Sequence, residues 1–337
     1  MKQNQKGITI VGLLITLIVI ITIAGVCIYT GRDLLEEAKK TELETNILLI
    51  QAAGKNLYDK HTLDNSVELI GTNLTNDNKP DDLYLDSDKY YVLDKTNLEQ
   101  LGINIAADEL DETNLKSEIQ SKNNVYVVNY EENTVCYLND NFYKDYQGLE
   151  YIEGTGTQVI DTKFTVNQDT KIELDYALTT VPATSANKAL IGVWTTGTNI
   201  YSIRIANNVL YYYYGSDTSH TGSTVITNTN RHKVKSDANS LYYDGEHITT
   251  RTANSFACNQ TISILAQHGS SSYSRIASAK IYNCKIWDNG VLVRNFIPCY
   301  RRIDNVVGMY DLVNNEFYEN AGTGTFVKGN AVTYIKY

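Results

Sequence analysis

The sequence opens with an apolar run that contains no charged residue from Gly7 to Thr30. At about 1.5 Å per residue, the stretch from Ile8 to Tyr29 is long enough to cross a hydrocarbon core of roughly 30 Å as a helix. Lys2 and Lys6 precede it, and basic residues beside a membrane favour the cytoplasmic side. The pattern predicts that the chain is inserted in a membrane with its bulk outside.

Helical spacing continues after the apolar run, with no Gly or Pro between Arg32 and Gly54. Because apolar residues recur on one face, we expect a single helix over residues 8–61, with residues 8–30 in the membrane or a filament core and the outer part packed on a globular head. The apolar positions of this outer part are Leu34, Leu35, Ala38, Leu43, Ile47, Leu48 and Ile50.

Residues 62–147 read as a small head with mixed elements. Its centre holds clustered Asp and Asn between Asn76 and Asp82, which lack the Gly and distal Glu of an EF-hand and indicate a solvated loop. The predicted elements are a strand, a short helix capped by Gly, and a two-stranded hairpin. They cover Lys89–Leu93, Asn97–Gly102, Val125–Tyr130 and Thr134–Leu138.

The second half of the chain contains short Val-, Ile-, Tyr- and Thr-rich runs separated by Gly, Asn, Asp or Ser, and it shows no helical period. This pattern is typical of an all-β sandwich. The predicted strands are Lys171–Ala177, Lys188–Trp194, Tyr201–Ile205, Val209–Tyr214, His232–Lys235, Ser240–Tyr243, Thr261–Ala266 and Ala277–Trp287.

The net charge of the chain changes near the start of this second half. Residues 1–148 carry 13 Lys+Arg and 24 Asp+Glu, whereas residues 149–337 carry 16 and 15. A chain of 337 residues is longer than one compact domain usually is. We therefore expect a boundary near residues 146–148, with the head over 62–147 and the sandwich over 148–337. Neither half has the basic patch that nucleic acid requires, which argues against DNA binding.

Four cysteines lie outside the apolar run, at Cys136, Cys258, Cys284 and Cys299. In an oxidising compartment they would allow two disulfides, whose connectivity the sequence does not fix. There is no CxxC motif, which argues against a zinc site.

The basic leader 1–7, the Gly7–Ile8 junction and the charge-free helix resemble the class III signal of type IV pilins and pseudopilins. The resemblance implies that a prepilin peptidase cuts after Gly7 and methylates Ile8. Most pilins carry Glu as the fifth mature residue, but this chain has Gly12 there. Subunits of the family that lack this Glu tend to be minor ones, which favours a minor pilin at the tip.

The segments YYVLDKTNLEQLGI and VYVVNYEENTVCYL resemble head segments of Gram-positive type IV pilins. The fold that this implies is a long helix laid on a small antiparallel sheet. The implied partners are other pilin subunits, the prepilin peptidase and the inner membrane assembly platform. The implied location is the cell membrane before assembly and the extracellular pilus or cell surface afterwards.

The ends of the second half also resemble a known family. The stretch Leu149–Thr162 opens this half, and Gly308–Phe326 closes it. Both look like the termini of concanavalin A-like (laminin-G-like) jelly-roll domains. The resemblance implies a jelly-roll sandwich, a fold that includes lectins, glucanases and protein-binding modules. The overall expectation is an α+β chain: a pilin helix and head followed by an all-β sandwich.

The catalytic motif of glucanases in the same family helps to distinguish hydrolysis from binding. The family's laminarinase-like glucanases carry Glu-x-Asp-x-x-Glu on one strand, and a glycosidase needs two catalytic carboxylates. This chain has Glu173 and Asp175 but places Leu178 where the acid–base Glu belongs. We therefore expect no enzymatic activity.

Carbohydrate binding requires exposed aromatic rings beside polar groups, sometimes positioned by calcium. In the Tyr211–Tyr214 run, alternate side chains face opposite sides of a strand, so two of them belong to the core. Trp194 follows an apolar run and could equally be a buried sandwich tryptophan. The candidate ligand-binding residues are Trp194, Asn199, Tyr211, Tyr213, Asp217, His220, His268 and Tyr273.

The sequence thus predicts a minor type IV pilin that presents a lectin-like adhesion domain for a glycan or host-surface ligand. No cofactor is expected beyond a possible structural calcium ion. The main alternative is a structural minor pilin, or a pseudopilin of a secretion or competence system, that primes filament assembly through protein contacts alone. A pilus-borne glycosidase is a third alternative, which Leu178 disfavours.

Overall fold

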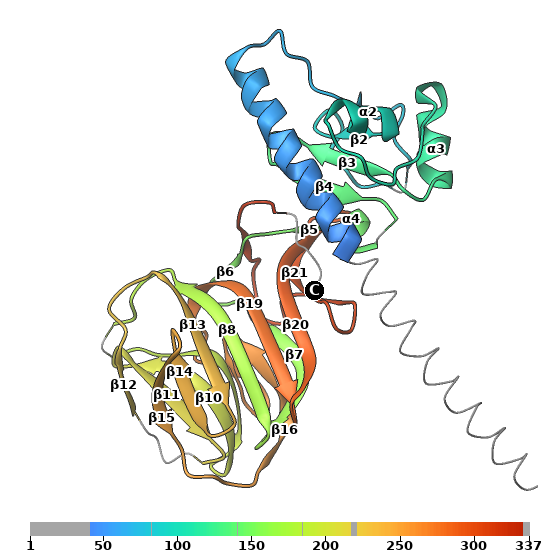
Figure 1. Cartoon of the computed structure of the whole chain (residues 1–337). Coiled ribbons are helices and arrows are strands. Elements are labelled where there is room, and N and C mark those ends of the chain that lie inside the picture. Colours follow the sequence, from blue (N-terminus) through green and yellow to red (C-terminus); the bar gives the residue numbers. More distant parts are fainter. Residues whose placement is uncertain (1–40, 82, 140, 184, 217–220, 333–337) are drawn as a thin grey trace, which may run out of the picture.

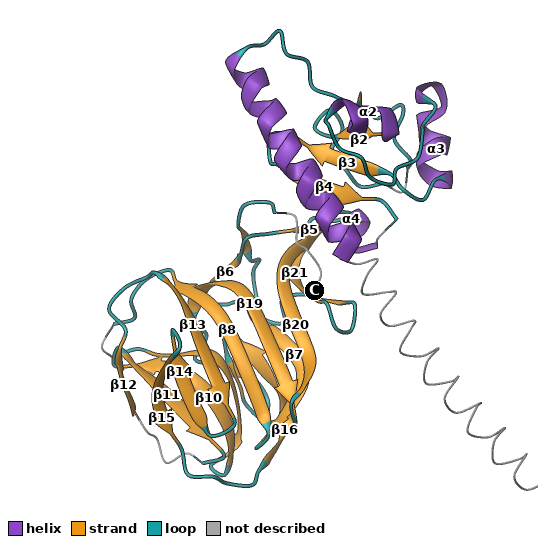
Figure 2. Cartoon of the chain, viewed as in Figure 1, coloured by secondary structure: helices purple, strands orange, loops and turns teal. Residues whose placement is uncertain are grey.

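The computed structural model describes residues 41–332 apart from 82, 140, 184 and 217–220 (Figure 1). The leader 1–7, the Gly7–Ile8 junction and the predicted span 8–30 lie outside the described residues, as do Asp217 and His220. In the described part, no helix is long and apolar enough to cross a membrane. Figure 2 shows two parts, a small head that holds the helices and a larger part built from strands.

In the head, a helix over residues 41–63 packs on a four-stranded antiparallel sheet of order β1-β2-β3-β4. Ile47 and Ile50 are fully buried against this sheet, while Leu48 and Leu49 on the other side of the helix are exposed. The predicted hairpin is confirmed as β3 and β4. The strands are β1 (Thr72–Asn73), β2 (Tyr91–Leu93), β3 (Tyr126–Asn129) and β4 (Thr134–Tyr137).

Short helices complete the head. The predicted helix begins earlier than expected, because the side chain of Asp94 accepts a hydrogen bond from the Asn97 N–H in a capping box. The pattern did not predict the helices that follow, whose apolar residues are too few to show a period. These elements are α2 (Lys95–Gln100), η1 (Glu112–Asn114), α3 (Leu115–Ser121) and α4 (Asn141–Asp145).

The second half is an all-β sandwich of two sheets, as the sequence predicts, and every strand pair in it is antiparallel except β17 with β9. The eight-stranded sheet has the order β12-β11-β10-β9-β16-β7, with β17 and β18 beside β9. Its strands are β7 (Ile160–Asn167), β9 (Asn187–Thr196), β10 (Asn199–Ala206), β11 (Val209–Tyr214), β12 (Thr221–Val225), β16 (Ala257–Ile264), β17 (Gln267–His268) and β18 (Tyr273–Ser274).

The eleven-stranded sheet has the order β15-β14-β13-β8-β19-β20-β21-β22; β5 pairs with β20, β6 with β19, and β23 with β6. Its strands are β5 (Tyr146–Gly148), β6 (Ile152–Thr155), β8 (Thr170–Leu178), β13 (Arg231–Asp237), β14 (Ser240–Tyr243), β15 (Glu246–Thr250), β19 (Ser278–Asp288), β20 (Val291–Arg301), β21 (Val307–Asp311), β22 (Glu316–Tyr318) and β23 (Val327–Lys328).

Alternating side chains of both sheets fill the space between them. Buried tyrosines bridge the layers: Tyr201 of β10 hydrogen-bonds Ser236 of β13, and Tyr212 of β11 donates to the carbonyl of Ala238. These hydroxyl groups need partners because burying an unpaired one is costly. The bonds therefore hold the eight-stranded sheet at a fixed position over the eleven-stranded one.

The opening and closing segments of the sandwich meet. The Thr323 N–H donates to the carbonyl of Thr157, and the side chain of Asn320 accepts from the Val159 N–H at 2.9 Å. A Cβ atom on Gly322 would lie 2.1 Å from the Thr157 carbonyl oxygen, so only glycine fits there. The two segments that resemble the termini of jelly-roll domains thus close the sandwich against each other.

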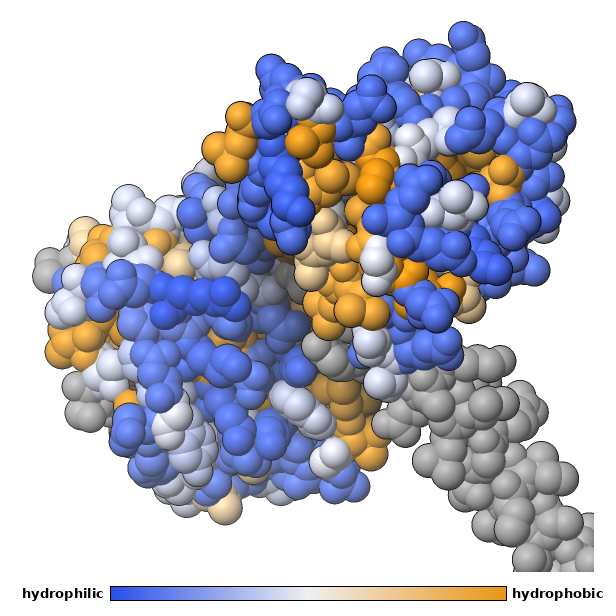
Figure 3. Space-filling view, turned by 45° about the horizontal axis from the view of Figure 1, so that its top comes forward, coloured by the Kyte–Doolittle hydropathy of each residue, from blue (hydrophilic) through white to orange (hydrophobic). Residues whose placement is uncertain are grey.

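The sandwich also contacts the head. Ile297, Cys299 and Tyr310 of β20 and β21 are buried in the same apolar cluster as the head residues. In Figure 3, apolar surface gathers where the head and the sandwich meet. A fragment that starts at residue 149 would expose Ile297 and Tyr310 to water, so ligand binding is best measured on the full chain.

A buried arginine lies at this junction. Arg302 donates to Oε1 of Gln147 at 2.9 Å and to Sγ of Cys136 at 3.1 Å, and it approaches Oη of Tyr90 at 3.4 Å. Burial raises the pKa of Tyr90 to about 12, so this hydroxyl is neutral at pH 7. Arg302 therefore joins the two parts through neutral groups.

Candidate functional site

A row of small and polar residues crosses the eight-stranded sheet. Asp161 of β7 lies opposite Ser263 of β16, which lies opposite Gly192 of β9; Gly192 in turn faces Ser202 of β10, and Ser202 faces Tyr213 of β11. Residues directly opposite in a sheet point to the same face. The apolar chain neighbours of these residues belong to the core between the sheets. The row therefore lies on the outer face of the eight-stranded sheet.

Three predicted aromatic residues gather on this outer face. The ring centroid of Trp194 lies 5.8 Å from that of Tyr213, which lies 6.4 Å from Tyr211 with an interplanar angle of 19°. Trp194 and Tyr211 are half-buried, and neither belongs to the core. Trp194 is thus a surface ring beside two tyrosines, and the alternative of a core tryptophan is excluded.

Tyr212 and Tyr214 point into the core, as the alternation of the run predicts. Strand β11 therefore divides the four tyrosines into two for packing and two for the outer face.

An arginine lies between the rings. The guanidinium carbon of Arg204 is 3.8 Å from the ring centroid of Tyr213 and 5.1 Å from that of Trp194, and Nη1 donates to Oε1 of Gln267 at 3.1 Å. Burial lowers the pKa of Arg204 to about 10, which leaves it charged at neutral pH. Such contacts hold the guanidinium and both rings in a fixed arrangement.

Two buried polar atoms on this face have no hydrogen-bond partner among the described residues. They are Nε of Arg204 and Oγ of Ser263. Gly192, which lies opposite Ser263 and Ser202, has no room for a side chain, because a Cβ atom there would lie 2.5 Å from Oγ of Ser202. Buried polar groups are normally hydrogen-bonded. These atoms are therefore candidates for contacts with a bound polar molecule.

A second group lies further along the same face. The rings of His268 and Tyr273 are 4.7 Å apart, and Oη of Tyr273 donates to Oδ2 of Asp161 at 3.2 Å. Nδ1 of His268 lies 2.8 Å from the carbonyl oxygen of Thr261. Burial raises the pKa of Tyr273 to about 12, so it remains a donor at neutral pH.

The carboxylate of Asp161 is expected to make the free energy of unfolding depend on pH. Burial opposes its ionisation, but hydrogen bonds from Thr261 and Lys163 outweigh burial and lower its pKa below 3.8. A lowered pKa in the folded state contributes stability that is present above the unfolded pKa and lost as the pH falls through the folded one. We expect Asp161→Asn to lower the free energy of unfolding at pH 7.

The difference between wild type and Asp161→Asn should shrink as the pH falls below about 5. Urea unfolding at pH 7, 5 and 3 measures this difference. A gap that stays constant over the series would contradict the role given to the Asp161 carboxylate.

The remaining predicted site residues either lie away from the cluster around Trp194 or fall outside the described residues. Asn199 begins β10 at the turn of the β9–β10 hairpin, opposite Thr196. Asp217 and His220 belong to the residues that the structure does not describe. The structure therefore brings together Trp194, Tyr211 and Tyr213, and it places His268 with Tyr273 nearby.

Pattern reasoning missed Arg204, Gln267 and Arg275. The signal for Arg204 was present, because it is the one charged residue in the otherwise apolar and polar strand Asn199–Ala206. No comparable signal marks Gln267 or Arg275, which reach the site through the turns around β17 and β18.

The two acids weighed for hydrolysis lie on the outer face of the other sheet. Nε and Nη2 of Arg231 donate to both carboxylate oxygens of Asp175 at 2.8 Å, and Nζ of Lys233 lies 3.3 Å from Oε1 of Glu173. Leu178 is buried in the core. Both carboxylates are thus held in ion pairs.

An open groove of about 310 Å³ lies over the same sheet, between Glu153, Thr179 and Arg231. Its aromatic ring, Tyr282, is covered by the guanidinium of Arg231 at 4.0 Å. A covered ring offers little area to a ligand, so this groove is a weaker candidate than the cluster around Trp194.

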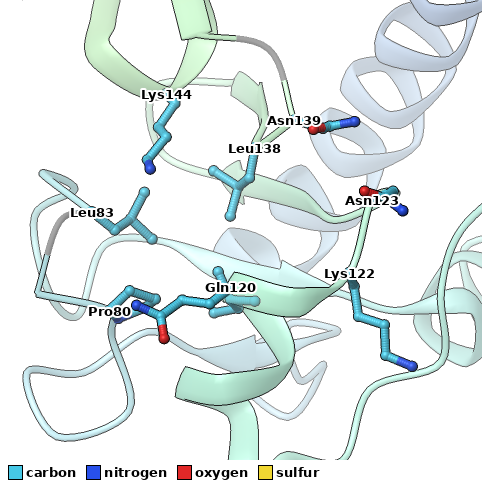
Figure 4. A pocket seen from close by; sticks show the side chains of 9 residues that line it. Pro80, Leu83, Gln120, Lys122, Asn123, Leu138, Asn139 and Lys144 are labelled. Carbon is cyan, nitrogen blue, oxygen red and sulfur yellow. The ribbon is translucent and has the colours of Figure 1, made fainter.

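A pocket of about 410 Å³ lies in the head. Figure 4 shows Lys144, Leu83 and Leu138 pointing towards its interior, while Lys122 points away. The described residues that line it include no aromatic ring and no carboxylate, so among them the groups that a saccharide site requires are missing. The lining residues are Pro80, Leu83, Ile119, Gln120, Lys122, Asn123, Leu138, Asn139 and Lys144.

The disulfides that the sequence allowed are not formed in this structure. Cys136, Cys258, Cys284 and Cys299 are buried free thiols. Each is packed in an apolar cluster, and burial raises the pKa of all four, to about 12 for Cys258. Among the described residues, no group of three or more His, Cys, Asp or Glu could hold a metal ion.

The solved structures compared with this chain below are distant neighbours. No family model matches the sequence, and no curated protein matches it. Among solved structures, a Bacteroides ovatus protein provisionally described as carbohydrate-binding is 13% identical, with a TM-score of 0.41 over 56% of this chain and 62% of its own.

Two further neighbours cover less of this chain. The CBM40 domain of the Ruminococcus gnavus IT-sialidase is 16% identical, with a TM-score of 0.31 over 42% of this chain and 89% of its own. The LG4-5 domains of the mouse laminin α1 chain are 14% identical, with a TM-score of 0.35 over 47% of this chain and 45% of theirs. Likeness of this degree transfers no ligand or site residue to the present chain.

Proposed function

We propose that the sandwich binds a saccharide on the outer face of its eight-stranded sheet and that the chain presents this module at the cell surface as a minor type IV pilin. The observation that carries the binding part is the half-buried ring of Trp194 beside buried polar atoms without partners, Nε of Arg204 and Oγ of Ser263. Sugar rings stack on aromatic side chains through their C–H faces, while their hydroxyl groups need polar partners.

The pilin part of the proposal rests on sequence. It is supported by the basic leader, the Gly7–Ile8 junction and the charge-free run to Thr30. A helix packed on a four-stranded antiparallel sheet, as found over residues 41–137, is compatible with the head expected of that family. The partners proposed are other pilin subunits, the prepilin peptidase and the membrane assembly platform.

A structural role is the second candidate. Leu48 and Leu49 of the helix over residues 41–63 are 51% and 46% exposed, and an adjacent subunit could cover them. In that case the sandwich would contact other subunits and bind no saccharide. The ion pairs on Glu173 and Asp175 favour either role over hydrolysis.

The test is a glycan array probed with the full chain in a mild detergent, with calcium and with EDTA. We expect specific binding to a subset of saccharides under both conditions, since no metal-binding cluster occurs among the described residues. Absence of binding both with calcium and with EDTA would contradict the lectin role and favour the structural one. Binding only with calcium would contradict a site built from side chains alone.

A further inference from the structure

Two cations flank the ring of Trp194. The guanidinium carbon of Arg204 lies 5.1 Å from the ring centroid, and that of Arg275 lies 5.9 Å from it. Arg275 is exposed, and its backbone carbonyl accepts a hydrogen bond from the Ala189 N–H at 2.7 Å, which fixes the loop before β19 against β9. The aromatic ring therefore carries a buried positive charge and an exposed one beside it.

Neither cation has an acidic partner within the described part of the chain. By contrast, Arg231, Arg294 and Arg301 each form an ion pair with an acidic residue. Arg204 has the amide oxygen of Gln267 as its hydrogen-bond acceptor, and its Nε has no partner.

Asp161, which lies on the same face, does not neutralise the charges of Arg204 and Arg275. Asp161 is engaged by Tyr273 and by Lys163, whose Nζ lies 3.1 Å from Oδ2. A buried charge without a counter-charge is costly. Burial and the charge of Arg275 both lower the pKa of Arg204, while the neighbouring Tyr213 opposes this effect.

We propose that the ligand of this site is an acidic saccharide, with its sugar ring on Trp194 and its carboxylate or sulfate group at Arg275, in front of the buried guanidinium of Arg204. This inference rests on the proposed saccharide binding. The planar guanidinium of an arginine matches both anionic groups and can bind them through two parallel hydrogen bonds. The anion would supply the counter-charge that the fold omits.

Calorimetric titration of the full chain in mild detergent tests the proposal with three matched disaccharides. They end in galacturonic acid, in galactose 6-sulfate and in galactose. Because a hydrogen bond to a charged group contributes about 1.5–3 kcal/mol, we expect at least one acidic probe to bind about tenfold or more tightly than the galactose probe. The tighter acidic probe identifies the anionic group, and its affinity should fall as salt is raised from 0.05 to 0.5 M.

Arg275→Gln should remove most of this preference, because it should weaken the acidic probe far more than the galactose probe. The control is Lys233→Gln, which removes one positive charge from the outer face of the opposite sheet and should have no effect on either probe. Arg204→Gln, checked for folding by thermal unfolding, should also reduce the preference.

The outcomes separate the two proposals. Equal affinity for the galactose and acidic probes, or an equal loss in Lys233→Gln and Arg275→Gln, would overturn the acidic ligand and leave saccharide binding standing. If none of the probes binds and the glycan array is also empty, both proposals fail together.

Discussion

Trp194→Ala is expected to weaken saccharide binding by about 2 kcal/mol or more, roughly 30-fold, while the sandwich stays folded. The ring is half-buried on the outer face, outside the core, and it contacts Tyr213 and Arg204. Removing it takes away the stacking surface and one of the two rings that the Arg204 guanidinium contacts. Calorimetric titration with the tightest ligand from the glycan array measures the loss.

The chain offers a matched control, since it contains one other tryptophan. Trp287 is also half-buried on a strand, but it lies on the eleven-stranded sheet with Nζ of Lys171 5.2 Å from its ring. Trp287→Ala should leave the affinity within a factor of about two, because exposed substitutions far from a site have small effects. An equal loss in both variants would show that the site does not lie at Trp194.

Tyr212→Ala is expected to lower the free energy of unfolding by about 3–5 kcal/mol, the range for truncating a large buried aromatic residue. Its side chain is fully buried between the sheets, packs 5.6 Å from the ring of Tyr201, and donates to the carbonyl of Ala238. The variant loses apolar contacts and leaves that carbonyl without its donor. Urea unfolding followed by tryptophan fluorescence measures the change.

The neighbouring residue in the same strand is the control. Tyr211 is half-buried on the outer face, so Tyr211→Ala should cost less than about 1 kcal/mol of stability and act on saccharide binding instead. If the two variants lost similar stability, the division of the tyrosine run between core and outer face would be wrong.

The division of the tyrosine run between core and outer face shows how much of the structure could be predicted from the sequence. A period of two is a local property, so it placed β8 to β11, β13, β14 and β19 within a few residues of their observed bounds. It also predicted that two of the four tyrosines belong to the core, and the structure shows that these are Tyr212 and Tyr214. Trp194 could not be decided in this way, because its neighbours Leu190–Val193 are apolar and a buried ring fits the same pattern.

The charged half of the site depends on long-range contacts. Arg275 follows β18 and reaches Trp194 because its carbonyl bonds to Ala189, more than 80 positions earlier. Gln267 meets Arg204 because β17 runs parallel to β9 at Gly192. No local periodicity encodes either pairing, and two short strands of two residues each give no pattern.

The junction between head and sandwich was unpredictable for the same reason. Ile297, Cys299 and Tyr310 lie in strands whose apolar residues a sandwich core would also accept. Arg302 directly follows β20 and looks like an ordinary surface arginine in the sequence, yet it is 8% exposed. Only the packing of the head against β20 and β21 distinguishes these residues.

Fluorescence of single-tryptophan variants tests the central claim most directly. Trp287→Phe leaves Trp194 as the sole tryptophan, and Trp194→Phe leaves Trp287. On titration with the saccharide that binds the full chain, the emission of Trp287→Phe should change and saturate at the calorimetric dissociation constant, and that of Trp194→Phe should stay constant. A response confined to Trp287, while calorimetry still shows binding, would place the ligand on the other sheet and contradict the proposed site.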